Sequence, residues 1–313
     1  MRATRHLRPA MRQSTTDGLL LVDKPAGMTS HDVVLAARRA FGESRIGHAG
    51  TLDPFATGLL VLLLGRATRL LPYLDGIPKV YEATMLLGRE TETDDLHGAV
   101  LRSAPPPGDD AIADAIAQLT GSLEQVPPAY SAKRVDGRRA YDAARAGVAL
   151  ELSPARVEVF AWRDVSRDGD VLRATIECGG GTYVRALARD MGRSLGCLGH
   201  LTALRRTVVS PFDEAQAVTL EALEAAAREG GEEALLRLLL PIEAALQDLA
   251  ELSVGQNDAA RLLRGQTVLI RGRDAPTSTG PTYATCKGHL IAVGRIEKGE
   301  LHPTRVFNFS NTG

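Results

Sequence analysis

Apolar positions along the first third of the chain predict three strands. Residues 19–22 form a short apolar run, residues 59–64 form a continuous one, and residues 80–87 have the same strand-like character. Between the first two runs, Ser30 is a suitable N-cap for an amphipathic helix that ends near Phe41. The chain is therefore expected to begin with a strand, a helix and a second strand.

The rest of the chain mixes helical and strand patterns before its texture changes. Residues 45–58 are rich in Gly and polar residues, which predicts a loop. After Leu252 short strands and turns predominate, so the last ~60 residues are expected to form a small, separate β-rich domain. Helices are expected at 68–74, 110–119, 183–195 and through 220–249, and strands at 156–162 and 171–178. This mixture predicts an α+β fold with a sheet at its centre.

Length and the N-terminal segment set further bounds. The 313 residues are 44% hydrophobic, which allows a large core and about two domains. The longest apolar run, 59–64, is far shorter than the ~20 residues of a membrane-spanning helix. The first sixteen residues hold five Arg or His and no apolar core, unlike a secretory signal. We therefore expect a cytoplasmic protein whose residues 1–16 form a disordered extension.

Charge and cysteine content exclude little. The net charge is −1, and only five of the 37 basic residues are Lys, the remainder being Arg. The planar Arg fork suits phosphate because it binds two oxygens at once, but a GC-rich genome would produce the same bias. Composition thus permits RNA binding without establishing it. The three widely spaced cysteines indicate neither a disulfide framework nor a zinc site, and are interpreted as small buried residues: Cys178, Cys197 and Cys286.

The segment 47–58, GHAGTLDPFATG, is the strongest candidate for chemistry. Three glycines bracket a single carboxylate, and glycine lets a backbone approach a ligand closely. Pro54 restricts Asp53 to extended conformations, because proline clashes with a helical residue before it. Taken alone, an Asp-Pro pair in a Gly-rich loop is more often only a turn.

A longer segment, GHAGTLDPFATGLL, resembles the signature of the TruB branch of pseudouridine synthases, in which the Asp of the LDP triplet is catalytic. Further segments resemble motifs of that family in the family's order: DKPAGMTSHD at 23–32, KVYE at 79–82, VPPAYSAK and GRRAY within 126–141, GTYVR at 181–185 and LRR at 204–206. The resemblance implies a pseudouridine synthase fold over 17–249, with a central mixed or antiparallel sheet flanked by helices. It also implies a small β-rich, PUA-like domain over 250–313.

The resemblance assigns catalytic chemistry to three residues. Asp53 would attack the target uridine at the base or at the anomeric carbon, and either route cleaves the glycosidic bond and rejoins the ring through carbon. Arg185 would keep that carboxylate ionised, because a cation within ~4–6 Å lowers a carboxyl pKa. Tyr81 would stack on the flipped base and assist its deprotonation. Without the resemblance, Arg185 would be interpreted as a solvated helix-face arginine like Arg189 and Arg193. No redox step, metal or ATP is needed, so no cofactor is expected.

The same resemblance implies how RNA is bound. His48 would hold the extruded RNA conformation, and Tyr183 and Leu204 would line the uridine pocket. An enzyme that remakes a glycosidic bond must flip its nucleotide out of the stack, and RNA loops with splayed bases are natural targets. The insertion at about 126–147 would grip RNA with cations interleaved with aromatics, among them Lys133, Arg134, Arg138 and Arg139. The implied substrate is uridine 55 in the T arm of tRNA, modified by a monomer that requires no protein partner.

Other interpretations stay open. The acidic residues Glu92, Asp94 and Asp95 could be taken for a magnesium site, but the segment resembles a non-metal motif of the family and is interpreted as polar structure near a strand end. A guide-dependent pseudouridine synthase acting in a ribonucleoprotein would share the catalytic motifs. A non-catalytic RNA-binding or RNA-folding protein could use the same scaffold.

Overall fold

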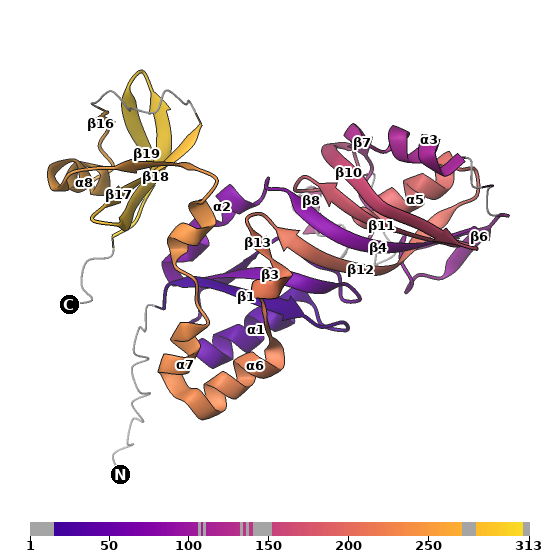
Figure 1. The fold of residues 1–313 in the computed structure, drawn as a ribbon, viewed down its shortest axis with the longest axis horizontal. Coiled ribbons are helices and arrows are strands. Elements are labelled where there is room, and N and C mark those ends of the chain that lie inside the picture. Colours follow the sequence, from indigo (N-terminus) through magenta and orange to yellow (C-terminus); the bar gives the residue numbers. More distant parts are fainter. Residues whose placement is uncertain are drawn as a thin grey trace, which may run out of the picture.

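Two β-sheets organise the protein, as seen in a computed structural model that describes residues 16–105, 108, 111–131, 134–135, 138–139, 152–270 and 280–308 (Figure 1). The larger sheet has ten strands: β1 (Gly18–Lys24), β2 (Ile46–Ala49), β3 (Thr57–Leu64), β4 (Lys79–Leu87), β7 (Gly121–Gln125), β10 (Ala155–Asp168), β11 (Val171–Cys178), β12 (Gly199–Val209), β13 (Phe212–Asp213) and β14 (Val218–Thr219). Their order is β14-β1-β3-β12-β4-β11-β10-β7, with β2 paired to β3 and β13 to β12. The β1–β14 and β3–β12 pairs are parallel and the rest antiparallel, so the predicted mixed central sheet is confirmed.

Helices cover both faces of this sheet (Figure 1). The helical elements are α1 (Ser30–Phe41), the 3-10 helix η1 (Gly65–Leu70), α2 (Leu71–Leu74), α3 (Ala111–Gln118), α5 (Val184–Ser194), the 3-10 helix η2 (Glu214–Gln216), α6 (Leu220–Ala225), the π-helix η3 (Ala226–Gly230), α7 (Gly231–Arg237) and the 3-10 helix η4 (Ile242–Leu246). Two hairpins lie outside the sheet: β5 (Arg89–Thr91) with β6 (Val100–Ser103), and β8 (Arg134–Val135) with β9 (Arg138–Arg139).

The apolar run of β3 is continuous because the strand is buried on both faces. Successive side chains of a strand point to opposite sides of the sheet. Leu60, Leu62 and Leu64 pack with α1, α6 and α7, whereas Leu59 and Leu63 pack toward η1, η4 and the C-terminal sheet. This central strand therefore provides a rigid support for the loop that precedes it.

The C-terminal sheet is built from β15 (Ala250–Ser253), β16 (Val268–Leu269), β17 (Pro281–Cys286), β18 (His289–Glu297) and β19 (Glu300–Val306), together with helix α8 (Gln256–Leu263). It shares an apolar cluster with the larger sheet, in which Phe307 packs among residues of η1 and η4. Arg69 donates to the Val306 carbonyl at 2.6 Å, and the Tyr73 and Thr304 hydroxyls are 2.7 Å apart. The two sheets thus form one packed unit, and within the described residues no helix is both long and apolar enough to cross a bilayer.

Three local predictions were wrong. Thr29, not Ser30, is the N-cap of α1, because its hydroxyl accepts from the Asp32 N–H and the Asp32 carboxylate accepts from the Thr29 N–H. Residues 46–49 form β2 inside the expected loop, since the edge of β3 offers them a hydrogen-bonding partner. The last domain also contains α8, which the strand-like texture concealed.

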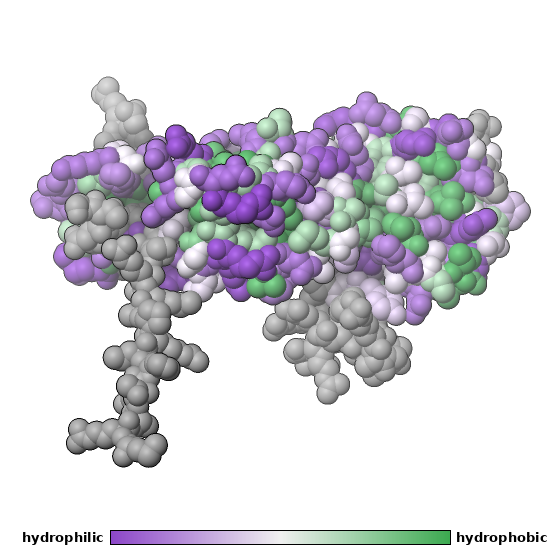
Figure 2. Space-filling view, turned by 90° about the horizontal axis from the view of Figure 1, so that it is seen from below, coloured by the Kyte–Doolittle hydropathy of each residue, from purple (hydrophilic) through white to green (hydrophobic). Residues whose placement is uncertain are grey.

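The surface is mostly hydrophilic, but hydrophobic side chains gather toward one end of the molecule (Figure 2). That end carries the β5–β6 hairpin, where Leu101 is 60% exposed (Figure 1). Neither Leu101 nor its neighbour Val100 lines the pocket described below. These two exposed residues therefore do not belong to the candidate site.

Candidate active site

The Asp53 loop between β2 and β3 is fixed at both sides by buried polar contacts. The Ser30 hydroxyl accepts from the Leu52 N–H at 2.8 Å and donates to the Leu52 carbonyl at 3.1 Å. The fully buried Lys24 ammonium donates to the carbonyls of Pro25, Met28 and Pro54 at 2.9, 2.7 and 3.3 Å. These contacts hold the residues on either side of Asp53, so the carboxylate sits on a rigid loop, as expected.

A test of this clamp compares two adjacent residues. Ser30→Ala leaves the buried Leu52 N–H and carbonyl without their partner, which should lower the free energy of unfolding by about 1–3 kcal/mol and also reduce activity. Thr29→Ala removes the N-cap and should cost about 1 kcal/mol while leaving activity unchanged. Denaturant titrations and initial rates measure both effects. Equal activity losses in the two variants would contradict a positioning role for Ser30.

Arg206 fixes the same loop from β12. Its side chain is fully buried, and its guanidinium donates to the Leu59 carbonyl at 2.8 Å and to the Gly50 carbonyl at 3.1 Å. Gly58 has a φ of 97°, and a Cβ there would lie 2.3 Å from the Arg206 carbonyl oxygen. Only glycine allows this approach of β3 to β12. The glycine that closes the sequence motif is therefore a packing requirement.

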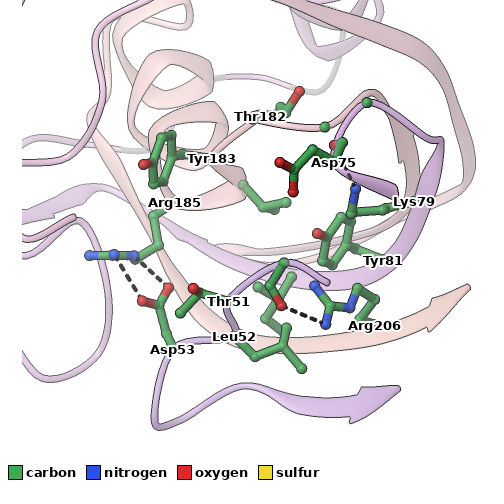
Figure 3. A pocket seen from close by; sticks show the side chains of 16 residues that line it. Thr51, Leu52, Asp53, Asp75, Lys79, Tyr81, Thr182, Tyr183, Arg185 and Arg206 are labelled. Carbon is green, nitrogen blue, oxygen red and sulfur yellow. Dashed lines mark hydrogen bonds and ion pairs between the residues drawn. The ribbon is translucent and has the colours of Figure 1, made fainter. Parts of the chain in front are cut away.

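Asp53 and Arg185 form a two-pronged ion pair (Figure 3). Arg185 Nε lies 2.8 Å from one carboxylate oxygen of Asp53, and Nη2 donates to the other at 3.0 Å. The Arg185 side chain is 4% exposed and the Asp53 side chain 31% exposed. Such fork-to-carboxylate pairs fix orientation as well as charge. The pair leaves the carboxylate accessible from one side.

The remaining donors of Arg185 hold the loops around it. They bind the carbonyls of Thr93 at 2.9 Å and Tyr130 at 2.7 Å, and Nη1 lies 3.5 Å from the Asp95 carboxylate. Arg185 therefore connects Asp53 to two further loops, those that carry Thr93 and Tyr130.

The expectation of a solvated face on α5 was wrong for the next arginine. Arg189 is 6% exposed and donates to the Asp94 carboxylate at 3.0 Å and to the Val126 carbonyl at 2.8 Å. Arg193 is half exposed but pairs with Glu90 at 2.7 Å. The acidic segment that includes Asp94 and Asp95, interpreted from the sequence as polar structure, thus provides carboxylate partners for the arginines of α5. Glu92 accepts from the Tyr130 hydroxyl at 2.9 Å.

Burial and the ion pair act on Asp53 in opposite directions. Burial raises the pKa of the Asp53 carboxyl above its ordinary value, and this is the larger effect. Arg185 lowers that pKa, the effect that the family resemblance implied, while the nearby Asp95 raises it. The net shift is upward, so Arg185 compensates for burial only in part.

The Asp53–Arg185 pair lies in a pocket of about 520 Å³ (Figure 3). Tyr81 from β4, Tyr183 at the start of α5 and Leu204 from β12 also line it, so five of the predicted site residues meet in one place. Tyr81 is buried, which raises the pKa of its hydroxyl. The pocket offers an aromatic wall, an aliphatic wall and, in the Asp53–Arg185 pair, a fixed carboxylate, which suits a flipped base; Asp75 also lines it.

Comparisons with known proteins identify the family. Residues 38–184 match the model of the "TruB family pseudouridylate synthase (N terminal domain)", and residues 185–247 match that of the "tRNA pseudouridylate synthase B C-terminal domain". The chain is 47% identical over 308 residues to "tRNA pseudouridine synthase B" of Rhodopseudomonas palustris, covering 97% of this chain and 84% of that protein. The chain belongs to the TruB family of pseudouridine synthases. A relative of the same name from Nitrobacter winogradskyi is 47% identical, covering 96% of this chain and 86% of its own length.

Two solved structures share the fold of this chain. The chain resembles a protein in "Structure of H/ACA RNP bound to a substrate RNA containing 2'-deoxyuridine" with a TM-score of 0.71 and 22% identity, covering 93% of this chain and 85% of that one. It also resembles a protein in "Crystal Structure of a Cbf5-Nop10-Gar1 Complex", with a TM-score of 0.68, 24% identity, and coverage of 93% and 84%. At these identities the likeness concerns the fold alone.

Two groups of predicted TruB-family residues remain: His48, which is not among the residues that line the pocket, and the cations of the insertion. His48 lies on β2, half-buried, where burial and Arg206 lower the pKa of its imidazole and favour the neutral form. Lys133 lies outside the described residues. The backbones of the other three cations form the β8–β9 hairpin, but their side chains lie outside the described part of the structure: Arg134, Arg138 and Arg139. The structure therefore does not test the predicted RNA contacts of this insertion.

Four residues of this TruB-family site were not selected from the sequence. Lys24 and Ser30 lie inside the motif at 23–32, Lys79 inside that at 79–82 and Arg206 inside that at 204–206, and none was given a role at the site; Ser30 was predicted only as a helix N-cap. The sequence did contain a signal for these residues, because each is a charged or polar residue close to apolar positions in the chain. Their importance becomes visible only when β1, β4 and β12 come together around the Asp53 loop.

Proposed function

We propose that this protein converts uridine to pseudouridine at position 55 in the T loop of tRNA, without a cofactor. The observation that carries the proposal is the fixed Asp53–Arg185 pair in a pocket lined by Tyr81, in a chain 47% identical to relatives named tRNA pseudouridine synthase B. Asp53 acts as the nucleophile, and Arg185 maintains its charge and orientation.

Each step has a residue suited to it. The target nucleotide leaves the RNA stack and enters the pocket, where Tyr81 stacks on the base and Tyr183 and Leu204 pack around it. The Asp53 carboxylate attacks the base or the anomeric carbon, the N1–C1′ bond breaks, and a bond from C5 to C1′ replaces it. On the anomeric route the carboxylate leaves C1′ as C5 attacks that carbon, and on the base route it leaves C6 after C5 has bonded to C1′; C5 then loses its proton and N1 gains one. Atoms and electrons balance without an external oxidant, metal or nucleotide.

The chain is divided into two domains. We place the catalytic domain at 17–249 and the PUA-like domain at 250–313, a boundary supported by the start of β15 at Ala250. Parts of the chain outside the pocket are assigned to RNA binding. The insertion at about 126–147 closes on the T arm, and His48 holds the extruded RNA conformation. The protein acts in the cytoplasm as a monomer and requires no protein partner.

The RNA-binding role of the insertion predicts a change in salt dependence. Replacing both Arg138 and Arg139 with Ala should weaken binding to T-arm RNA and flatten the plot of log Kd against log salt by about 0.7 for each lost single-strand phosphate contact. Filter binding or fluorescence anisotropy between low and physiological salt measures the slope. Because both residues lie in β9 and are assigned to phosphate contacts rather than to the reaction, the turnover of bound RNA should be preserved. An unchanged slope would place the phosphate contacts elsewhere.

The two alternatives make different predictions. A guide-dependent enzyme would be inactive on free tRNA, and a non-catalytic RNA-binding protein would bind without isomerising. The high identity to relatives named for tRNA favours the stand-alone enzyme over the guide-dependent one, whose likeness rests on fold alone.

Two transcripts separate these functions. The purified protein is incubated with an elongator tRNA transcript and with the same transcript carrying cytidine at position 55. Nuclease digestion and mass spectrometry then quantify pseudouridine. We expect about one pseudouridine in the first RNA and none in the second. Equal pseudouridine in both would refute the assigned position, and none in either would refute the assigned reaction.

A further inference from the structure

A second, unassigned cation lies at the opposite end of the pocket from Asp53. Lys79 is the first residue of β4 and lines the pocket two residues before Tyr81, on the same face of the strand because side chains alternate. Figure 3 shows Lys79, Tyr81 and Arg206 on one side of the pocket and the Asp53–Arg185 pair on the other. A ligand between these groups would contact the carboxylate at one end and a cation at the other.

The Lys79 ammonium is buried without a paired carboxylate. Its side chain is 5% exposed, and Nζ donates to two main-chain carbonyls, those of Asp75 at 3.2 Å and Ile77 at 3.1 Å. An ammonium has three donors, so one remains after these two bonds. Within the described residues Lys79 makes no salt bridge. Burying a charge in this way is unfavourable unless a ligand completes its contacts.

The neighbouring side chains keep Lys79 against the pocket. Arg206 faces it from β12, Cys178 from β11 and Asp75 from the turn after α2. At Gly50, a Cβ would lie 3.3 Å from Lys79 Cε, so the loop that carries Asp53 also packs on the lysine stem. Gly180 approaches the Asp75 carbonyl so closely that a Cβ would lie 1.7 Å from it. These closely packed neighbours therefore hold the Lys79 ammonium in place beside the pocket.

We propose that Lys79 is a further catalytic residue, an inference that rests on the proposed reaction at Asp53. Lys79 donates a hydrogen bond to a carbonyl oxygen of the flipped uracil and stabilises the negative charge that develops on the ring. A donor fixed before the reaction stabilises developing charge more than it stabilises the neutral ground state. Lys79 therefore contributes to turnover more than to RNA affinity.

The role fits both routes open to Asp53. If Asp53 attacks the anomeric carbon, the N1–C1′ electron pair stays on the uracil, which becomes an anion with charge on N1, O2 and O4. If Asp53 adds to C6, the C5–C6 electron pair moves toward C5 and O4 as an enolate. In each case O4 gains negative charge that is returned to the ring when C5 binds C1′. Lys79 remains protonated throughout, so no proton transfer through it is required.

The ionisation of Lys79 gives the inference a distinctive signature. Burial, and to a smaller extent Arg206, lower the pKa of Lys79 to about 8, while Cys178 and Asp75 oppose the shift. The ammonium is present below that pH and is lost as pH rises through it. Cys178, with a pKa of about 11, and Tyr81, with a raised pKa, do not titrate there. Burial also lowers the pKa of Lys24 to about 8, so a substitution at Lys79 must separate the two lysines.

The test compares the wild type, Lys79→Met and Lys79→Arg in single-turnover reactions with T-arm RNA, alongside RNA affinities. We expect Lys79→Met to lower the rate constant at least 100-fold with RNA affinity within about threefold, in line with the loss of one preorganised donor. Lys79→Arg should retain more activity than Lys79→Met, and the fall in rate at high pH should move upward, because arginine stays protonated.

The outcomes separate the inference from the proposed function. An inactive wild type would refute the proposed reaction itself. An active wild type with an equally active Lys79→Met, or with a loss confined to affinity, would overturn the role of Lys79. If Lys79→Met does not fold, the pH profile of Lys79→Arg tests the proposal instead. If its rate constant falls at the same high pH as that of the wild type, the fall belongs to Lys24 and the proposal is overturned.

Discussion

Replacing Asp53 with Asn should abolish pseudouridine formation while leaving affinity for T-arm RNA within a few-fold. The amide cannot serve as the nucleophile, whereas the phosphate contacts assigned to the insertion lie elsewhere. The loop itself should persist, because Ser30, Lys24 and Arg206 fix it through backbone groups rather than through the carboxylate. Single-turnover assays and binding titrations on the same preparation measure both quantities.

Asp53→Glu is the matched control for charge. It keeps the negative charge beside Arg185 but displaces the carboxylate by one methylene, so we expect a large loss of turnover here too. Thermal unfolding verifies that both variants fold. A folded Asn variant that still forms pseudouridine would exclude Asp53 as the nucleophile.

Replacing Arg185 with Met should lower turnover by about 100- to 1,000-fold, the range seen when one preorganised electrostatic contact is lost. The substitution removes both hydrogen bonds to Asp53 and leaves the carbonyls of Thr93 and Tyr130 without their donor. Arg185→Lys keeps the charge but cannot span both carboxylate oxygens, so its activity should be intermediate. Wild-type activity in the Met variant would show that the pair is dispensable.

The same variant carries a pH prediction whose sign follows from the structure. Asp53 acts as an anion, so activity is present above its pKa and is lost as pH falls through it. Burial raises that pKa and Arg185 opposes the rise, so removing Arg185 should move the acidic limb of kcat/KM to higher pH. Rate profiles of the wild type and of Arg185→Lys, in which a cation remains, complete the series. A limb that does not move would mean that another group controls it.

Much of the site was predictable because its residues lie in contiguous motifs. Asp53, Arg185, Tyr81, Tyr183 and Leu204 were each selected from motif resemblance, and the structure brings all five to one pocket. The elements that carry them have strong local signals. The doubly buried strand β3 has an unbroken apolar run, and β11 was predicted with its observed limits.

What escaped prediction depends on partners distant in sequence. Thr29 and Ser30 are both residue types that favour the N-cap position. The Ser30 hydroxyl instead forms hydrogen bonds with the Leu52 backbone, which leaves Thr29 as the N-cap. Arg189 looks like any exposed arginine on α5 until the Asp94 turn folds over it. The Gly and His residues of the short strand β2 carry no strand signal of their own. The strand forms by pairing with β3, a partner that the local sequence does not reveal.

One measurement tests the central claim most directly. The purified protein is incubated with unmodified T-arm RNA in EDTA, with no cofactor added, and pseudouridine is mapped by carbodiimide modification and primer extension, with Asp53→Asn in parallel. The account predicts a stop at the T-loop uridine with the wild type and none with the variant. No stop from a folded wild-type protein that binds the RNA, or equal stops from both proteins, would contradict it.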